Sequence, residues 1–218
     1  DLQDQGLSGL SAEEVLRARN HGVDGDYVEG IAALGHKGLG LDALLQLRNH
    51  AVDPDYIRGM RQHGYRLDVH ELLNARNHGV TPSYVASLAD FGYTKLSLDE
   101  LLNARNHGVD PAYLSGMRQL GYRATLADVI NARNHGVTPD YIQGMAAVGY
   151  TKLPLESLIR LRDHGVTPDF VQRIKSRVSN PSVEELIRLR DSGIVQAAQP
   201  TALTWSKADR MGVDGVPE

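Results

Sequence analysis

The chain has 218 residues, of which 23 are Lys or Arg and 27 are Asp or Glu, so its formal net charge is -4. Nucleic-acid-binding proteins usually carry a clear basic excess, so this charge balance argues against a nucleic-acid partner. The absence of cysteine excludes disulfides, thiolate metal sites and thiol chemistry. No apolar stretch reaches the roughly 18 residues of a membrane-spanning helix, and no signal peptide is recognisable, so we expect no membrane contact within this chain.

One phrase recurs along the chain and predicts a tandem repeat. It reads ARNHGV at its first copy, which begins at Ala18, and LRDSGI at its last, which begins at Leu189. The seven copies begin at residues 18, 47, 75, 104, 132, 161 and 189, so the spacing alternates between 29 and 28 residues. Such a period is typical of solenoids. We predict an all-α fold, an α-solenoid of about six and a half two-helix repeats over residues 11–195, preceded by a lead-in at residues 1–10.

The first helix of each unit is predicted to begin at a capping box and to end at a glycine with a left-handed backbone. Ala51 replaces this glycine in one unit, which would cost on the order of 1 kcal/mol if its backbone is left-handed. The boxes pair Ser11 with Glu14, Asp68 with Glu71, Ser97 with Glu100 and Ser182 with Glu185, and the glycines are Gly22, Gly79, Gly108, Gly136, Gly165 and Gly193.

The second helix is predicted to begin at an Asp or Thr N-cap that is followed by proline, and to end at another glycine. Both helices are too short to be stable alone and must pack against neighbouring units. Gly144 and its counterparts inside the second helices would allow a close backbone approach. The cap and proline pairs begin at Asp53, Thr81, Asp110, Thr138 and Thr167, and the final glycines are Gly35, Gly64, Gly92, Gly121 and Gly149.

Alternate units resemble each other more than adjacent units do, which gives a 57-residue super-repeat. The sequence GYTKL recurs from Gly92 and Gly149, and GMRQ recurs from Gly59 and Gly116. We hypothesise a ribbon with two chemically different faces, one lined by small residues and one by Arg and Gln. Residues 196–218 leave the pattern and form a tail, which is either a flexible terminus or a segment that docks Leu203 and Trp205 on the last apolar groove.

A histidine recurs near the end of the first helix in six units. Packed helices lie about 8 to 10 Å apart, so histidines of successive units are too far apart to share a metal ion. We expect each histidine side chain to bond the last free carbonyl groups of its helix. His70 and Glu71 resemble a zinc-protease motif, but Asn74 stands where the second histidine ligand would be. The sequence therefore predicts neither a metal site nor a cofactor. The histidines are His21, His50, His78, His107, His135 and His164.

An arginine precedes each of these positions and lies beside the apolar stripe. It either bonds helix ends and the recurring Asn side chains of the adjacent unit, or forms a ladder that grips an acidic partner. The candidate partner-binding residues are three of these arginines together with the Arg-Gln pairs of the GMRQ repeats. They are Arg76, Arg105, Arg133, Arg61, Gln62, Arg118 and Gln119.

No phosphate-binding loop, nucleophile elbow or isolated Ser/His/Asp set interrupts the repeat. Residues that recur in every unit serve the architecture first, so the sequence favours a non-catalytic scaffold that binds a protein or peptide, as a monomer or weak homodimer. The alternative is modular nucleic-acid recognition with one unit per base.

The segment RNHGVTPDYIQGM with a following GY, from Arg133 to Tyr150, resembles tandem repeats appended to bacterial membrane metallopeptidases of the beta-lactam sensor-transducer type and to related envelope proteins. The resemblance covers about residues 11–195. It implies no catalytic activity, because the zinc motif and membrane helices of the peptidase domain have no counterpart here. It implies a sensing or docking array on the periplasmic side, whereas the residues alone also allow a cytoplasmic location.

Overall fold

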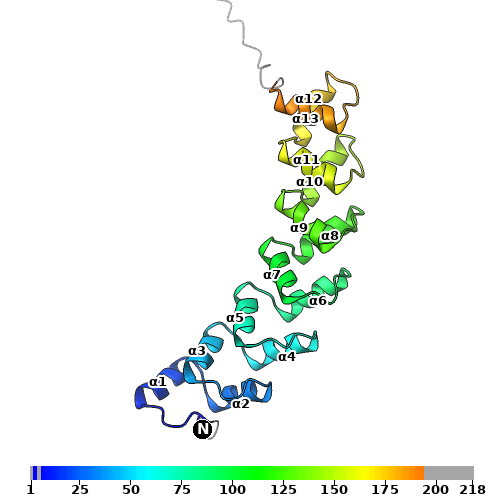
Figure 1. The fold of residues 1–218 in the computed structure, drawn as a ribbon. Helices are drawn as coiled ribbons and strands as arrows, with labels where there is room; N and C mark the ends of the chain where they lie inside the picture. The colour runs from blue at the N-terminus through cyan, green and yellow to red at the C-terminus, as the bar shows by residue number, and fades with distance from the viewer. Residues whose placement is uncertain (1, 4–5, 194–218) are drawn as a thin grey trace, which may run out of the picture.

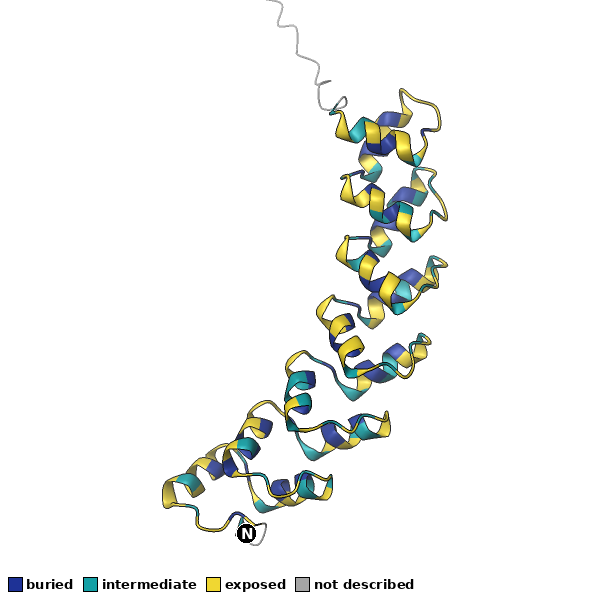
Figure 2. Cartoon of the chain, viewed as in Figure 1, coloured by how far each residue is buried: buried dark blue, intermediate teal, exposed yellow. Residues whose placement is uncertain are grey.

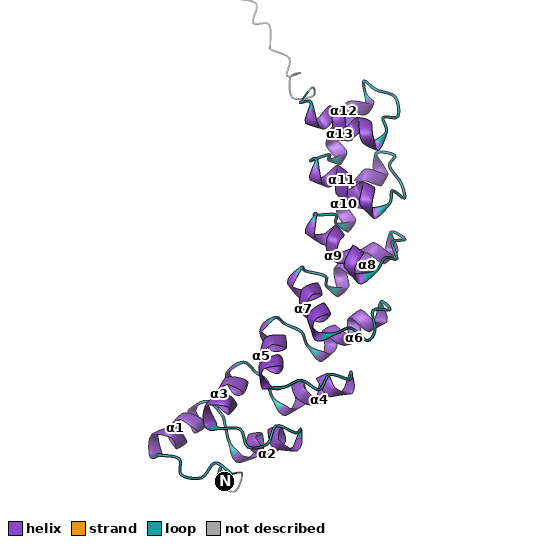
Figure 3. Cartoon of the chain, in the orientation of Figure 1, coloured by secondary structure: helices purple, strands orange, loops and turns teal. Residues whose placement is uncertain are grey.

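The computed structural model describes residues 2–3 and 6–193, and within them the chain contains thirteen α-helices and no strand (Figure 3). The predicted all-α solenoid is confirmed: six helix pairs and a final single helix follow one another along an elongated, curved array (Figure 1). The first helices are α1 (Ala12–Asn20), α3 (Leu41–Asn49), α5 (Val69–Asn77), α7 (Leu98–Asn106), α9 (Leu126–Asn134), α11 (Leu155–Asp163) and α13 (Val183–Asp191). The second helices are α2 (Gly25–Ala33), α4 (Pro54–Gln62), α6 (Pro82–Asp90), α8 (Pro111–Gln119), α10 (Pro139–Ala147) and α12 (Pro168–Lys175).

The helices form two rows. Second helices pack against second helices, from α2 on α4 through to α10 on α12, and first helices pack against first helices, as α1 does on α3 and α11 on α13. A continuous apolar core runs between the rows from Leu7 to Ile187 (Figure 2), and no polar residue of the described chain is fully buried. Each unit therefore gains its stability from its neighbours.

The predicted helix boundaries are confirmed. All four capping boxes form, and a fifth joins Thr125 to Asp128, where the shorter Asp replaces Glu. The glycines that end the helices have left-handed backbones, with φ of 70° at Gly22 and 87° at Gly35, and Ala51 adopts the same region with φ of 55°.

The alternation of 28 and 29 residues has a local cause. The longer units carry one extra residue in the loop after their second helix, and its backbone is left-handed in each case. This residue is Gly38 in the first unit, with φ of 71°, and Lys95 and Lys152 in the later ones, with φ of 57° and 54°. A left-handed backbone is unfavourable for lysine and free of this penalty for glycine.

Close approach between second helices also follows the sequence expectation. A Cβ atom added at Gly116 would lie 2.5 Å from Cγ of Pro139, the first residue of α10, and Gly144 meets Pro168 of α12 at 2.7 Å in the same way. In α6 the equivalent residue is Ser87, whose hydroxyl donates to the carbonyl of Tyr84. Glycine and proline of successive units thus interlock at most junctions of this row.

The hypothesis of two chemically different faces is wrong. Ala89 and Arg118 occupy equivalent positions near the C-terminal ends of α6 and α8, and both helices belong to the same row. The two residue classes therefore alternate along one row, because a period of two units alternates along a solenoid and not across it.

Arg118 reaches back to the carbonyls of Asp90 and Phe91 at 3.4 and 3.0 Å, and Lys175 of α12 reaches the carbonyl of Val148 at 2.9 Å.

Two residues before the first helix make backbone hydrogen bonds that also occur inside the repeats. The amide groups of Gly6 and Leu7 donate to the carbonyls of Gln3 and Leu2, the same pattern that Gly35 and His36 make at the end of α2. Gly6 and Leu7 thus make the backbone hydrogen bonds that end the helices of the array.

The first helix α1 has a neighbouring first helix on one side only in the described chain. Val15 and Leu16 are consequently 47% and 57% exposed, whereas the equivalent Leu44 and Leu45 of α3 are buried. At the other end, Leu203 and Trp205, proposed above to dock on the last groove, lie outside the described residues.

Candidate interaction surface

Five of the six recurring histidines connect neighbouring units through their side chains, whereas His107 makes no such bond with the described residues. His21 Nδ1 lies 2.7 Å from Oδ1 of Asn49, and His135 Nδ1 lies 2.6 Å from Oδ1 of Asp163. Nδ1 must donate to the aspartate, because a carboxylate only accepts. The prediction that the imidazole would bond the helix-end carbonyls is wrong. The backbone N–H of His21 donates to the carbonyl of Arg17 instead. The described residues hold no group of three or more His, Asp or Glu that could bind a metal ion.

The recurring arginines also lie between units. The guanidinium carbons of Arg76, Arg105 and Arg133 lie 5.1, 5.1 and 4.9 Å from the ring centres of Tyr56, Tyr84 and Tyr113 in the preceding unit. This geometry is a cation–π contact. Three of the predicted partner-binding residues thus already contact the protein itself.

All nine tyrosines of the chain donate their hydroxyl to a backbone carbonyl of the following unit. Five of them lie in second helices, such as Tyr84, which donates to Val109 at 2.9 Å. Burial raises the pKa of each of these five to about 12. The other four lie in loops, such as Tyr122, which donates to Leu153 at 2.8 Å. The aromatic hydroxyls are therefore structural.

The remaining predicted site residues lie at the ends of α4 and α8. Arg61 is half-buried, and its Nε has no hydrogen-bond partner. Arg118 contacts the end of α6 as described above and stacks on Phe91 at 4.7 Å. Gln62 and Gln119 are exposed. These residues belong to the row of second helices and Arg76, Arg105 and Arg133 to the row of first helices, so the structure does not bring the seven together in one patch.

A different set of basic residues is free. The loops that join each second helix to the next first helix, here called the loop edge, each carry one exposed basic residue. None of these side chains makes an ion pair or hydrogen bond with another described residue. These residues were not among the predicted partner-binding residues, although the GYR and GYTK motifs place one basic residue after each Gly-Tyr pair. They are Lys37, Arg66, Lys95, Arg123, Lys152 and Arg177.

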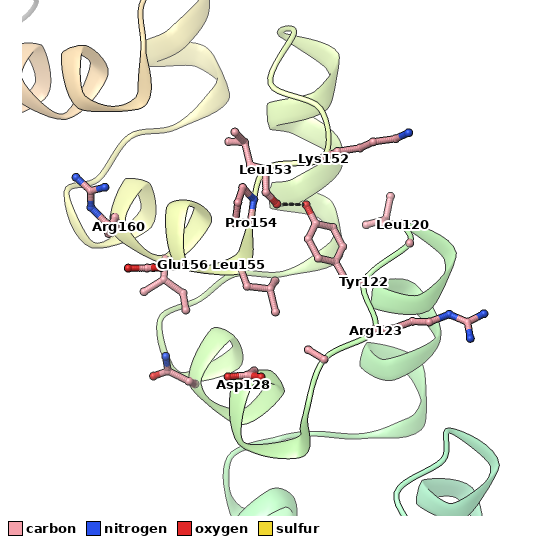
Figure 4. Close-up of a pocket in the computed structure, with 14 residues that line it drawn as sticks. Leu120, Tyr122, Arg123, Asp128, Lys152, Leu153, Pro154, Leu155, Glu156 and Arg160 are labelled. Carbon is pink, nitrogen blue, oxygen red and sulfur yellow. Dashed lines mark hydrogen bonds between the residues drawn. The ribbon is translucent and has the colours of Figure 1, made fainter.

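A groove of about 1010 Å³ opens between two of these loops and the helices α9 and α11 (Figure 4). Tyr122, Leu153 and Leu155 provide apolar surface at its centre, and Lys152 and Arg123 project from one side of it. Asp128 and Arg160 also line it, but Asp128 is held in its capping box and Arg160 pairs with Glu184 at 3.0 Å. The groove thus combines an apolar floor with two unpaired cations, Lys152 and Arg123, and one unpaired carboxylate, Glu156. No family model and no curated protein matches the chain.

Proposed function

We propose that this chain is a non-catalytic scaffold that binds a protein or peptide partner along its loop edge. The observation that carries the proposal is the division of the polar residues into two groups. Most of the recurring histidines and arginines and all of the tyrosines make contacts between units, whereas the loop edge keeps unpaired cations beside an apolar groove.

The shape of the groove supports a segment of polypeptide as the ligand. An open groove with an apolar floor and polar borders suits side chains that extend from a peptide backbone. The array offers several loops in succession, so weak contacts made at each unit would add along the partner. The resemblance to appended repeats of envelope proteins agrees with a docking array, and we propose the periplasm as its location on that basis.

Substitution of Asn131 by Trp tests the groove. Asn131 is exposed on α9 and lines the groove, so an indole there would fill the groove without entering the core. Gln46→Trp is a matched control, because Gln46 is exposed at the equivalent position of α3 and does not line the groove. Peptides would be selected by display on the purified protein and their affinities measured for the three proteins by fluorescence anisotropy.

The proposal predicts that selected peptides lose at least about tenfold in affinity with Asn131→Trp, as for an obstructed contact of roughly 1.4 kcal/mol. They should retain it with Gln46→Trp. Failure to select any specific peptide, or equal affinities for all three proteins, would contradict the assignment.

A further inference from the structure

We infer that the loop edge binds an extended acidic segment of the partner, with about one carboxylate side chain for each unit of the array. This inference rests on the proposed function and names the chemistry of the partner. It is carried by the free charge of the loop edge, by the spacing of that charge, and by the backbone conformation at two of its lysines.

The free charge of the loop edge is predominantly positive. Carboxylates also border it in the first turns of the first helices, but most are engaged. Glu71 and Glu100 bond back to their own N-caps, and Glu184 pairs with Arg160. Of the first-turn carboxylates from α3 to α13, Asp99 and Glu156 alone have no such partner among the described residues. Asp90, the last residue of α6, is also exposed and its carboxylate has no partner among the described residues, so six exposed cations face three free carboxylates.

The spacing of the cations favours a polypeptide. They recur once per unit, and neighbouring packed helices lie about 8 to 10 Å apart. A peptide in the polyproline II conformation advances about 3.1 Å per residue with three residues per turn, so acidic side chains at every third position lie on one side of it, about 9 Å apart, and would meet one cation per unit. The phosphates of a duplex strand recur about every 3.4 Å along the axis, which is much denser.

Two of the lysines of the loop edge have a strained backbone conformation. Lys95 and Lys152 have left-handed φ angles, and both are exposed. The first unit shows that the loop accepts glycine at this point, because Gly38 has the same conformation. Packing does not require a side chain there. A lysine that makes no hydrogen bond or ion pair with the described residues and disfavours its own backbone conformation is explained by a use of its ammonium group outside the chain.

The groove adds an apolar contact to this electrostatic one. Lys152 and Arg123 project from the same side of it, next to Leu153 and Tyr122 (Figure 4). An acidic segment with one aliphatic residue between its carboxylates would place that residue on the groove floor and the neighbouring carboxylates against the two cations.

The double substitution Lys95→Gly with Lys152→Gly separates binding from folding. It removes two cations and two strained residues together, so the thermal midpoint should rise while the affinity for an acidic peptide falls. Ala51→Gly is the matched control, because it relieves the same strain in a loop of the other kind, which has no free cation. The probe is a fluorescein-labelled synthetic peptide with Glu at every third position, one Leu, and Ser or Gly elsewhere.

The wild-type protein and Ala51→Gly should bind this peptide equally, and the double variant should bind it roughly three- to thirtyfold more weakly. A peptide of the same composition with its Glu residues clustered should bind more weakly than the spaced one. Unchanged affinity in the double variant would overturn the inference, as would tighter binding of a single-stranded oligonucleotide at the same salt concentration.

The two proposals can fail separately. If display-selected peptides bind in the groove and respond to Asn131→Trp while the acidic probe does not bind, the partner is not acidic and the scaffold function stands. If neither kind of peptide binds, both proposals are rejected.

Discussion

Gly116→Ala tests the interlock between second helices. Alanine is favoured over glycine inside a helix by about 1 kcal/mol, so the substitution would stabilise α8 in isolation. In the array, however, the new Cβ would lie 2.5 Å from Cγ and 2.9 Å from Cβ of Pro139, where ordinary contact begins near 3.4 Å. Pro139 is the first residue of α10, so its ring cannot withdraw unless that helix moves. Overpacking of this kind costs about 1 to 3 kcal/mol, and we expect the upper part of this range. The net loss should be about 1 to 2 kcal/mol.

Urea unfolding followed by circular dichroism measures this loss. Ser87→Ala is the control, because Ser87 occupies the equivalent position of α6 and already carries a Cβ, so its effect should stay within about 0.5 kcal/mol. Adding Pro139→Ala to Gly116→Ala should recover most of the loss. A Gly116→Ala protein that is more stable than the wild type would refute the close contact between the two helices.

Two further predictions concern the tyrosine positions. His36 stands in the loop position where later units have tyrosine, and its buried Nε2 has no hydrogen-bond partner. The substitution His36→Tyr should supply the missing hydrogen bond, to the Leu67 carbonyl, as Tyr65 does to the Leu96 carbonyl in the next unit. We expect the unfolding free energy, measured by urea titration, to rise by about 1 kcal/mol. Burial, aided by the nearby Arg61, lowers the pKa of His36 below 6.5. The wild type should therefore lose stability as the pH falls below 6.5, and the His36→Tyr variant should lose less. Equal losses in the two proteins would contradict the assignment of this pH dependence to His36. The tyrosines of the second helices have pKa values of about 12 against 10.0 when unperturbed, so their contribution is complete below pH 10 and is lost as the pH rises through 12. Tyrosinate absorbance should then appear together with the loss of helical circular dichroism, and tyrosines that ionise near pH 10 with the helices intact would contradict their burial.

The fold was predictable because its signals are local and repeated. A capping box or an N-cap followed by proline determines where a helix begins, and a glycine determines where it ends, without reference to the rest of the chain. Even the left-handed backbone of Ala51 followed from its position in the repeat. The left-handed backbones of Lys95 and Lys152 were less visible, although the extra residue in every second unit was a usable signal.

The partners of individual side chains were harder to predict. The sequence showed that histidines and arginines recur, but not that His21 would meet Asn49 or that Arg105 would lie over Tyr84, because these contacts depend on how one unit rotates onto the next. The same dependence explains why the two-face hypothesis failed. The groove between α9 and α11 could not be located either, since it is formed by loops of two successive units.

Hydrogen exchange measured by mass spectrometry, with and without the bound acidic peptide, tests most directly whether this array binds through its loop edge. The account predicts that protection on binding is concentrated in residues 63–68, 91–97, 120–125 and 148–154, which hold four of the six free cations and the two loops that line the groove. The loops within each helix pair, which carry the histidines, should exchange as before. Protection centred on those histidine loops, with the loop edge unchanged, would contradict it.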